Sequence, residues 1–306
     1  MLRNLLSSAS LLAVVSLANA AGFTDVLISG GGPGCKASNL TGAQVTASCS
    51  ETLDRVTTSG SATAVAAGGH LGNAIAVETQ ADASDGPGGY VALTYAQTVD
   101  RLRIDGSNGE QGQGLMTFTV NLAMQRTSVT NAPGPSAATL AATGTDLRAD
   151  VTIAGENHSL LMQEYYRVDY RPDTGPIGNG DSFAYIDDVL VPSALGPRTF
   201  VVPFTFGQEF DLELGLHGYA TASASGDGHA SININAMNSF DWRGIQSVTV
   251  GGRDVAYTLT SQSGVDWISP VPEPASVWLM AIGLGACASL VRVQKRRATS
   301  SVSSSR

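Results

Sequence analysis

The sequence predicts an all-β fold, and three observations lead to this prediction. Short segments such as 115–122 and 210–216 alternate apolar and polar residues, which is the period of a strand with one buried face. Clusters rich in glycine, asparagine and proline, such as 106–109, separate these segments as turns do. Helical periodicity is rare between them. We therefore expect residues 21–270 to form one β-sandwich of the jelly-roll type.

The strands themselves are predicted from the alternation. In 115–122, the side chains of Met116, Phe118, Val120 and Leu122 fall on one face, whereas polar residues occupy the other. Further strands are expected, in chain order, at 26–29, 74–79, 89–97, 100–104, 147–153, 182–190, 199–206, 231–236, 247–250 and 256–260.

One segment allows two interpretations. Residues 157–168 fit an amphipathic helix, with Leu160, Leu161, Glu164, Tyr165 and Val168 on one face. A strand through 161–169 agrees with the same residues equally well. The sequence leaves both alternatives open.

Composition and charge exclude several classes of protein. The chain has 306 residues, of which 43% are apolar and only 14% charged, so it is not an intrinsically disordered protein. Residues 21–270 contain 25 acidic and 11 basic side chains, a net charge near −14. Such a domain repels nucleic acid, which needs Lys and Arg, and attracts divalent cations.

The N-terminus is predicted to be a secretory signal peptide, residues 1–20. Arg3 lies in a short positive region, and an apolar stretch follows over 5–17. Ala18 and Ala20 form the small-residue cleavage pattern, so the mature chain is expected to begin at Ala21.

Export also bears on the cysteines. Cys35 and Cys49 lie in the exported part, where the environment is oxidising, so we expect them to pair. The bridge would close a loop of about 15 residues and stabilise the domain by about 3 kcal/mol in the chain-entropy model.

Three features follow one another at the C-terminus. Pro272, Glu273 and Pro274 come first, and the uncharged segment 275–291 comes next. A helix of this length spans about 25 Å, the short end of a transmembrane helix. The basic residues after it are Arg292, Lys295, Arg296 and Arg297. They are expected to stay in the cytoplasm, which places the body outside. The tail 298–306 is predicted to be disordered.

This arrangement over 271–297 resembles the PEP-CTERM sorting signal of exported proteins in Gram-negative, exopolysaccharide-producing bacteria. The resemblance implies that an exosortase, a transpeptidase-like enzyme of the inner membrane, recognises the chain and cleaves it near Pro-Glu-Pro. It also implies a transient inner-membrane anchor with a periplasmic body, followed by delivery to the cell surface or beyond. The serine-rich tail is longer than is typical of this signal.

Segment 173–188 is the candidate metal site. It reads as an acidic loop with glycines between its oxygen-bearing residues, and calcium binds such oxygens in flexible loops. The candidate ligands are Asp173, Asn179, Asp181, Asp187 and Asp188. The alternative is a solvated acidic loop without metal. No other cofactor is predicted.

No catalytic residues are predicted, because metal-protease and serine-hydrolase motifs such as HExxH and GxSxG do not occur in the sequence. His217 and His229 are interpreted as surface or half-buried side chains that could meet across a hairpin. The leading hypothesis is a non-enzymatic surface or matrix protein, structural or adhesive in an exopolysaccharide biofilm. The alternatives are a calcium-assisted carbohydrate-binding module and a polysaccharide hydrolase with an unrecognised carboxylate pair.

Overall fold

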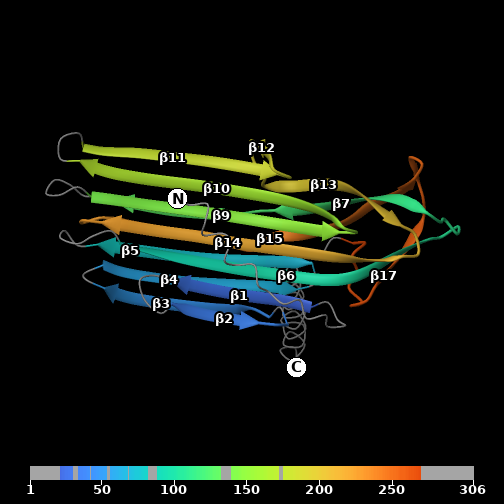
Figure 1. The fold of residues 1–306 in the computed structure, drawn as a ribbon, viewed down its shortest axis with the longest axis horizontal. Coiled ribbons are helices and arrows are strands. Elements are labelled where there is room, and N and C mark those ends of the chain that lie inside the picture. The colour runs from blue at the N-terminus through green and yellow to red at the C-terminus, as the bar shows by residue number, and fades with distance from the viewer. Residues whose placement is uncertain are drawn as a thin grey trace, which may run out of the picture.

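A computed structural model describes residues 21–29, 34–41, 43–53, 56–67, 69–81, 88–131, 139–171 and 175–269. They form seventeen strands in two large antiparallel sheets that lie one over the other (Figure 1). This confirms the predicted β-sandwich. In the part of the chain so described, no helix is long and apolar enough to cross a membrane. The predicted signal peptide 1–20, sorting segment 271–297 and tail 298–306 lie outside it.

The first sheet has nine strands. Its order is β12 (Val189–Val191), β11 (Gly175–Ile186), β10 (Glu156–Arg171), β9 (Thr139–Ile153), β14 (Glu209–Ser225), β6 (Gly88–Gly106), β1 (Ala21–Ser29) and β2 (Cys35–Asn39). The ninth, β17 (Tyr257–Ser261), pairs with the last part of β6, beyond the residues that β1 occupies.

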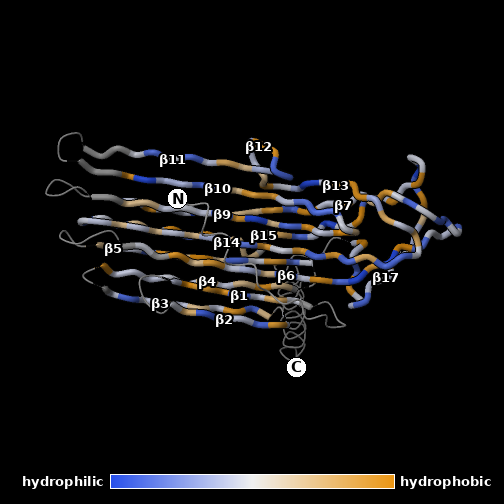
Figure 2. The backbone as a smooth tube through the Cα atoms, in the orientation of Figure 1, coloured by the Kyte–Doolittle hydropathy of each residue, from blue (hydrophilic) through white to orange (hydrophobic). Residues whose placement is uncertain are grey.

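The second sheet has eight strands. Its order is β13 (Gly196–Thr205), β7 (Gln113–Leu122), β15 (His229–Val250), β5 (His70–Ala81), β4 (Val56–Ala67) and β3 (Val45–Leu53). Two more strands, β8 (Gln125–Asn131) and β16 (Arg253–Asp254), pair with β15. Hydrophobic and hydrophilic residues alternate along many strands of both sheets (Figure 2).

Segment 157–168 is a strand, which decides between the two alternatives. It belongs to β10, which pairs along almost its whole length with β9 on one side and β11 on the other. Leu160 and Met162 are buried in the core, so the period is two. The two neighbouring ladders satisfy the backbone hydrogen bonds, and this tertiary pairing outweighs the local helical pattern.

The core changes in character along the sandwich. Between β7, β13 and the second half of β15 it is aromatic, with Phe118 stacked on Trp242 at a centroid distance of 5.0 Å. Between β4, β5 and the second half of β14 it consists largely of alanine. There the sheets approach closely enough for Asn73 and Thr79 to donate hydrogen bonds to backbone carbonyls of β14. These hydrogen bonds connect the two sheets directly in the alanine-rich part of the core.

Candidate functional site

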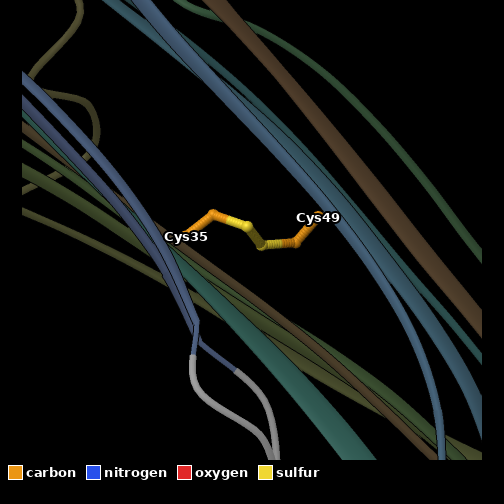
Figure 3. The surroundings of a disulfide bond; sticks show 2 residues. All are labelled: Cys35 and Cys49. Carbon is orange, nitrogen blue, oxygen red and sulfur yellow. A yellow bond between two sulfur atoms is a disulfide. The ribbon is translucent and has the colours of Figure 1, made fainter.

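The disulfide joins the two sheets. Cys35 lies on β2, the edge strand of the first sheet, and Cys49 lies on β3, the edge strand of the second. Their sulfur atoms are bonded, with Cα atoms 6.0 Å apart, and Figure 3 shows the bridge crossing from one layer to the other. The bond therefore ties together one open side of the sandwich.

The interpretation of 173–188 as an acidic loop is wrong for most of its length. Asn179 and Asp181 lie within β11, which pairs with β10 from Arg171↔Gly175 to Leu160↔Ile186. Asp187 and Asp188 form the turn before β12, both with positive φ. At a rise of about 3.3 Å per residue, Asp181 and Asp187 are roughly 20 Å apart, so they cannot share one ion. Asp173 lies outside the described residues.

Asp187 has a structural role instead. Its Oδ1 accepts a hydrogen bond of 2.8 Å from the backbone N–H of Ser159, and its Oδ2 lies 2.9 Å from Nδ1 of His158. These contacts fasten the turn to the start of β10. Across the described ranges, no group of three or more His, Cys, Asp or Glu side chains is placed to hold a metal ion.

His217 and His229 do not meet, because they lie in different sheets. His229 on β15 contacts Oε1 of Glu78 at 2.9 Å on the outer face of the second sheet. His217 on β14 belongs to the outer face of the first sheet, where it is part of a larger group of side chains.

This group, which we call the Tyr95 cluster, forms because three adjacent strands place large polar residues opposite one another. Tyr95 of β6 pairs with His217 of β14, and His217 pairs with Arg148 of β9. The neighbours of these residues along each strand are fully buried, so the cluster faces outward. The Tyr95 cluster comprises Tyr95, Gln97, Arg148, Asp150, Glu213 and His217.

Specific contacts hold the cluster. The rings of Tyr95 and His217 lie 4.4 Å apart between centroids, and Nε2 of His217 is 3.5 Å from Oδ2 of Asp150. The guanidinium Nε of Arg148 donates a 2.8 Å hydrogen bond to Oδ1 of Asp150. Next to them, Nε2 of Gln97 donates a 2.6 Å hydrogen bond to Glu213. These bonds leave the side chains preorganised on a rigid sheet.

Gly215 forms the floor of the cluster. A Cβ atom at this position would lie 3.8 Å from Nε2 of His217, 3.8 Å from Cβ of Asp150 and 3.9 Å from a ring carbon of Tyr95. A side chain would therefore fill the space that these three residues surround. Glycine at this position is buried, so the side chains of Tyr95, Asp150 and His217 close over it.

Electrostatics keep the two rings uncharged near neutral pH. Burial, together with the carboxylates of Glu213 and Asp150, raises the pKa of Tyr95, so the phenol keeps its proton. Burial lowers the pKa of His217, and Asp150 opposes this effect without overcoming it. A neutral imidazole offers one donor and one acceptor, and a neutral phenol offers both as well.

Aromatic rings and carboxyl groups continue over the same face. Phe23 on β1 lies 5.8 Å from Tyr95 between centroids, and Tyr219 follows His217 on the same side of β14. Burial raises the pKa of Asp146, which lies opposite Tyr219 on β9, while a hydrogen bond with Gln163 opposes the shift. The first sheet therefore presents rings interleaved with hydrogen-bonding groups.

Sequence reasoning missed this cluster. The interpretation of His217 as a surface or half-buried side chain did not connect it with residues of other strands. The available signal was the size of the polar residues in 93–97, 146–150 and 213–219. Many other strands carry the smaller Ser and Thr at their outward positions. That signal acquires meaning only when the pairing of β6, β14 and β9 is known.

A second group of contacts fastens the end of the body, and we call it the C-terminal latch. Asp100 on β6 is 4% exposed, and its Oδ2 accepts hydrogen bonds from Ser261 (2.6 Å), Ser263 (2.5 Å) and the indole of Trp267 (2.6 Å). Backbone N–H groups of Arg101 and Ser263 donate to Oδ1. The carboxylate therefore collects five donors, four of them from 261–267.

Trp267 is fully buried in the latch. Its backbone carbonyl accepts a 2.7 Å hydrogen bond from the indole of Trp242, and the two indole rings meet edge to face at 5.8 Å. Gly244, with φ of 91°, allows the backbone at Ile268 to pass close to β15, because a Cβ at position 244 would lie 2.4 Å from the carbonyl oxygen of Ile268. The chain is thus fixed in place up to the residues just before 270.

The comparisons with known proteins concern the segment that follows the latch. Residues 270–297 match the model of the PEP-CTERM protein-sorting motif. No protein of known function and no solved structure showed significant similarity to the chain. The chain is thus an all-β protein that carries a PEP-CTERM sorting motif, which confirms the resemblance seen in the sequence. The motif indicates exosortase-type processing and sorting to the cell exterior.

Proposed function

We propose that the body is a non-enzymatic surface or matrix protein, structural or adhesive, which binds exopolysaccharide through the Tyr95 cluster. The observation that carries this proposal is the contact of the Tyr95 and His217 rings beside Asp150, packed over the small residue Gly215. The sorting motif supports it, since it directs the body to the side of the membrane where such polymers lie.

The chemistry of the cluster suits a sugar. Aromatic rings offer apolar faces that pack against the C–H faces of pyranose rings. Around them, carboxylate, amide and guanidinium groups accept from and donate to ring hydroxyls in fixed directions. The side chains are already held by hydrogen bonds with one another, so binding orders few groups and loses little entropy.

The C-terminal latch supports delivery of a rigid module. Pro272 follows Trp267 by five residues, a reach of at most about 18 Å in a fully extended chain. The folded body therefore stays close to the sorting motif while that motif is processed. A body that is fixed up to Trp267 keeps its binding face intact during transfer.

A carboxylate pair in the same cluster favours a second candidate, a polysaccharide hydrolase. Asp150 and Glu213 are diagonal neighbours on β9 and β14, about 7–8 Å apart, which overlaps the separation of inverting glycosidases. The carboxyl group whose pKa burial raises is Asp146, however, and it lies about 13 Å along β9 from Asp150. That distance exceeds the span of a two-carboxylate mechanism, so binding without cleavage is the better supported proposal.

Binding can be measured with the full chain in detergent. Affinity electrophoresis through gels that contain exopolysaccharide from the producing organism should retard the wild-type protein. Tyr95→Ala should weaken retardation at least tenfold, whereas Ser223→Ala, on the same face of β14, should leave it within twofold. Equal retardation of both variants would contradict the proposal. Release of reducing ends by the wild type would establish the hydrolase instead.

A further inference from the structure

A shallow groove crosses the outer face of the second sheet, on the opposite side of the sandwich from the Tyr95 cluster. Its volume is about 440 Å³. One row of paired residues runs along it, perpendicular to the strands, from β3 through β4, β5 and β15 to β8. These residues are Ser48, Ser61, Ala76, Asn233 and Thr127.

The length of the groove indicates a chain rather than a small molecule. Five neighbouring strands, about 4.8 Å apart, extend over about 19 Å. The central residue of the row, Ala76, has a small side chain. A polymer segment laid across the strands would touch one hydroxyl or amide group on most of them.

The lining is almost uncharged, although the body as a whole is strongly acidic. Glu78 is the one charged side chain among the lining residues that the structure describes, and its carboxylate contacts His229 at 2.9 Å. The other polar lining residues carry hydroxyl or amide groups, which donate and accept equally well. Such a surface complements a neutral ligand rich in hydroxyl groups and gives an anionic one no counter-charge.

The composition argues against a protein partner. Protein–protein interfaces are enriched in Tyr, Trp and Arg and depleted in Ser. The lining contains Ser48, Ser59, Ser61 and Ser231 and no aromatic residue. The occupant that fits this groove is therefore a polyhydroxylated chain.

We propose that the groove holds a segment of uncharged polysaccharide and that the body, with the Tyr95 cluster on its other face, cross-links two glycan chains. The cross-linking part rests on the proposed function, whereas binding in the groove does not. Two sites on opposite faces of a rigid sandwich cannot close on one short segment, so they connect separate segments of polymer.

The groove can be tested by placing a charge in it. Ser61→Glu puts a carboxylate on its floor, and Thr52→Glu puts the same charge on the same outer face beyond the lining residues. Affinity electrophoresis of the full chain in detergent would use dextran, pullulan and galactomannan as neutral probes and alginate as an anionic one. With Tyr95→Ala as background, Ser61→Glu should reduce retardation by neutral polymer at least tenfold, and Thr52→Glu should change it less than twofold.

Cross-linking has its own readout, the low-shear viscosity of the neutral polymer. The wild type should raise this viscosity, and Tyr95→Ala and Ser61→Glu should each abolish the rise. Tyr95→Ala would still bind through the groove, and Ser61→Glu would still bind through the Tyr95 cluster. If Ser61→Glu cross-links like the wild type, the groove proposal fails and the Tyr95 cluster stands. If Ser61→Glu alone abolishes all binding, the groove stands and the proposed function fails. Three other outcomes would overturn the groove proposal. They are stronger retardation by alginate than by the neutral polymers, no retardation by any polymer, and self-association that Ser61→Glu removes.

Discussion

The indole N–H of Trp267 donates a 2.6 Å hydrogen bond to Oδ2 of Asp100, across 167 positions of sequence. This bond joins the last buried residue before the sorting motif to the central part of the first sheet. The donors around the carboxylate come from Ser261, Ser263 and the backbone of Arg101 as well. The stability of the C-terminal latch therefore depends on one negative charge.

The first prediction concerns that charge. Asp100→Asn places an amide N–H₂ against a shell composed of donors, so at least one donor loses its acceptor, at a cost of about 1–3 kcal/mol. The thermal midpoint of the full chain in detergent, followed by near-UV circular dichroism at pH 7, should fall by several degrees. Asp211→Asn, at an exposed position on the outer face, is the control and should change it little. An unchanged midpoint in Asp100→Asn would contradict the latch.

The second prediction is the pH dependence of the same residue. Burial alone would raise the pKa of Asp100, but the hydrogen bonds from Ser261, Ser263, Trp267 and Arg101 outweigh it, so the pKa lies below its usual range. A depressed carboxyl pKa stabilises the folded state above the unfolded-state value near 3.8, and this stabilisation is lost as the pH falls through the folded-state pKa. The difference between wild type and Asp100→Asn in urea unfolding should thus be constant above about pH 5 and shrink below about pH 4. If the stability difference between the wild type and Asp100→Asn grew as the pH fell, the prediction would be contradicted.

The third prediction concerns Asp146 on the outer face of the first sheet. Because burial raises its pKa, the ionised form is disfavoured in the folded state, and this costs stability above the folded-state pKa. Asp146→Asn should therefore increase the midpoint of urea unfolding at pH 7, and the gain should vanish at pH values where the wild-type carboxyl is protonated. A loss of stability at pH 7 would show that the carboxylate makes stabilising contacts instead. A gain combined with weaker glycan binding would identify Asp146 as a residue retained for binding.

The fourth prediction concerns the disulfide between the edge strands β2 and β3. Cys35→Ser combined with Cys49→Ser should destabilise the body by about 2–4 kcal/mol, because the bond restricts the unfolded chain. Reduction with dithiothreitol should lower the wild-type midpoint to that of the double variant and leave the variant unchanged. If reduction lowers both midpoints equally, the bridge is not the source of the effect.

The sequence was sufficient to predict the all-β class, because alternation in segments such as 115–122 reflects one buried face directly. It was insufficient where the contrast between the faces is weak. Strand β4 was missed because the inward residues Ala62, Ala64 and Ala66 alternate with small residues, among them Val65, so the two faces differ little. Strand β15 was predicted as two strands, since the irregularity between Ala236 and Phe240 interrupts its period.

The candidate sites were harder to predict because they depend on which strands are neighbours. Asp181 within β11 and Asp187 in the turn after it are close in sequence but far apart in space, whereas Tyr95, Asp150 and His217 are distant in sequence and adjacent in space. The C-terminal latch likewise joins Asp100 to Trp267 through the pairing of β17 with β6. Local spacing carries no information about such pairings, and the segment 270–297 was recognisable only because its features lie in one continuous run.

A side chain placed at Gly215 gives the most direct test of the proposed function. Gly215→Leu occupies the space between Tyr95, Asp150 and His217 without removing any of them, and Thr221→Leu adds the same side chain elsewhere on the outer face of β14. In affinity electrophoresis with the exopolysaccharide of the producing organism, we expect Gly215→Leu to lose at least nine-tenths of the retardation and Thr221→Leu to keep it. Full retention of binding by Gly215→Leu, with an unchanged thermal midpoint, would contradict binding at the Tyr95 cluster.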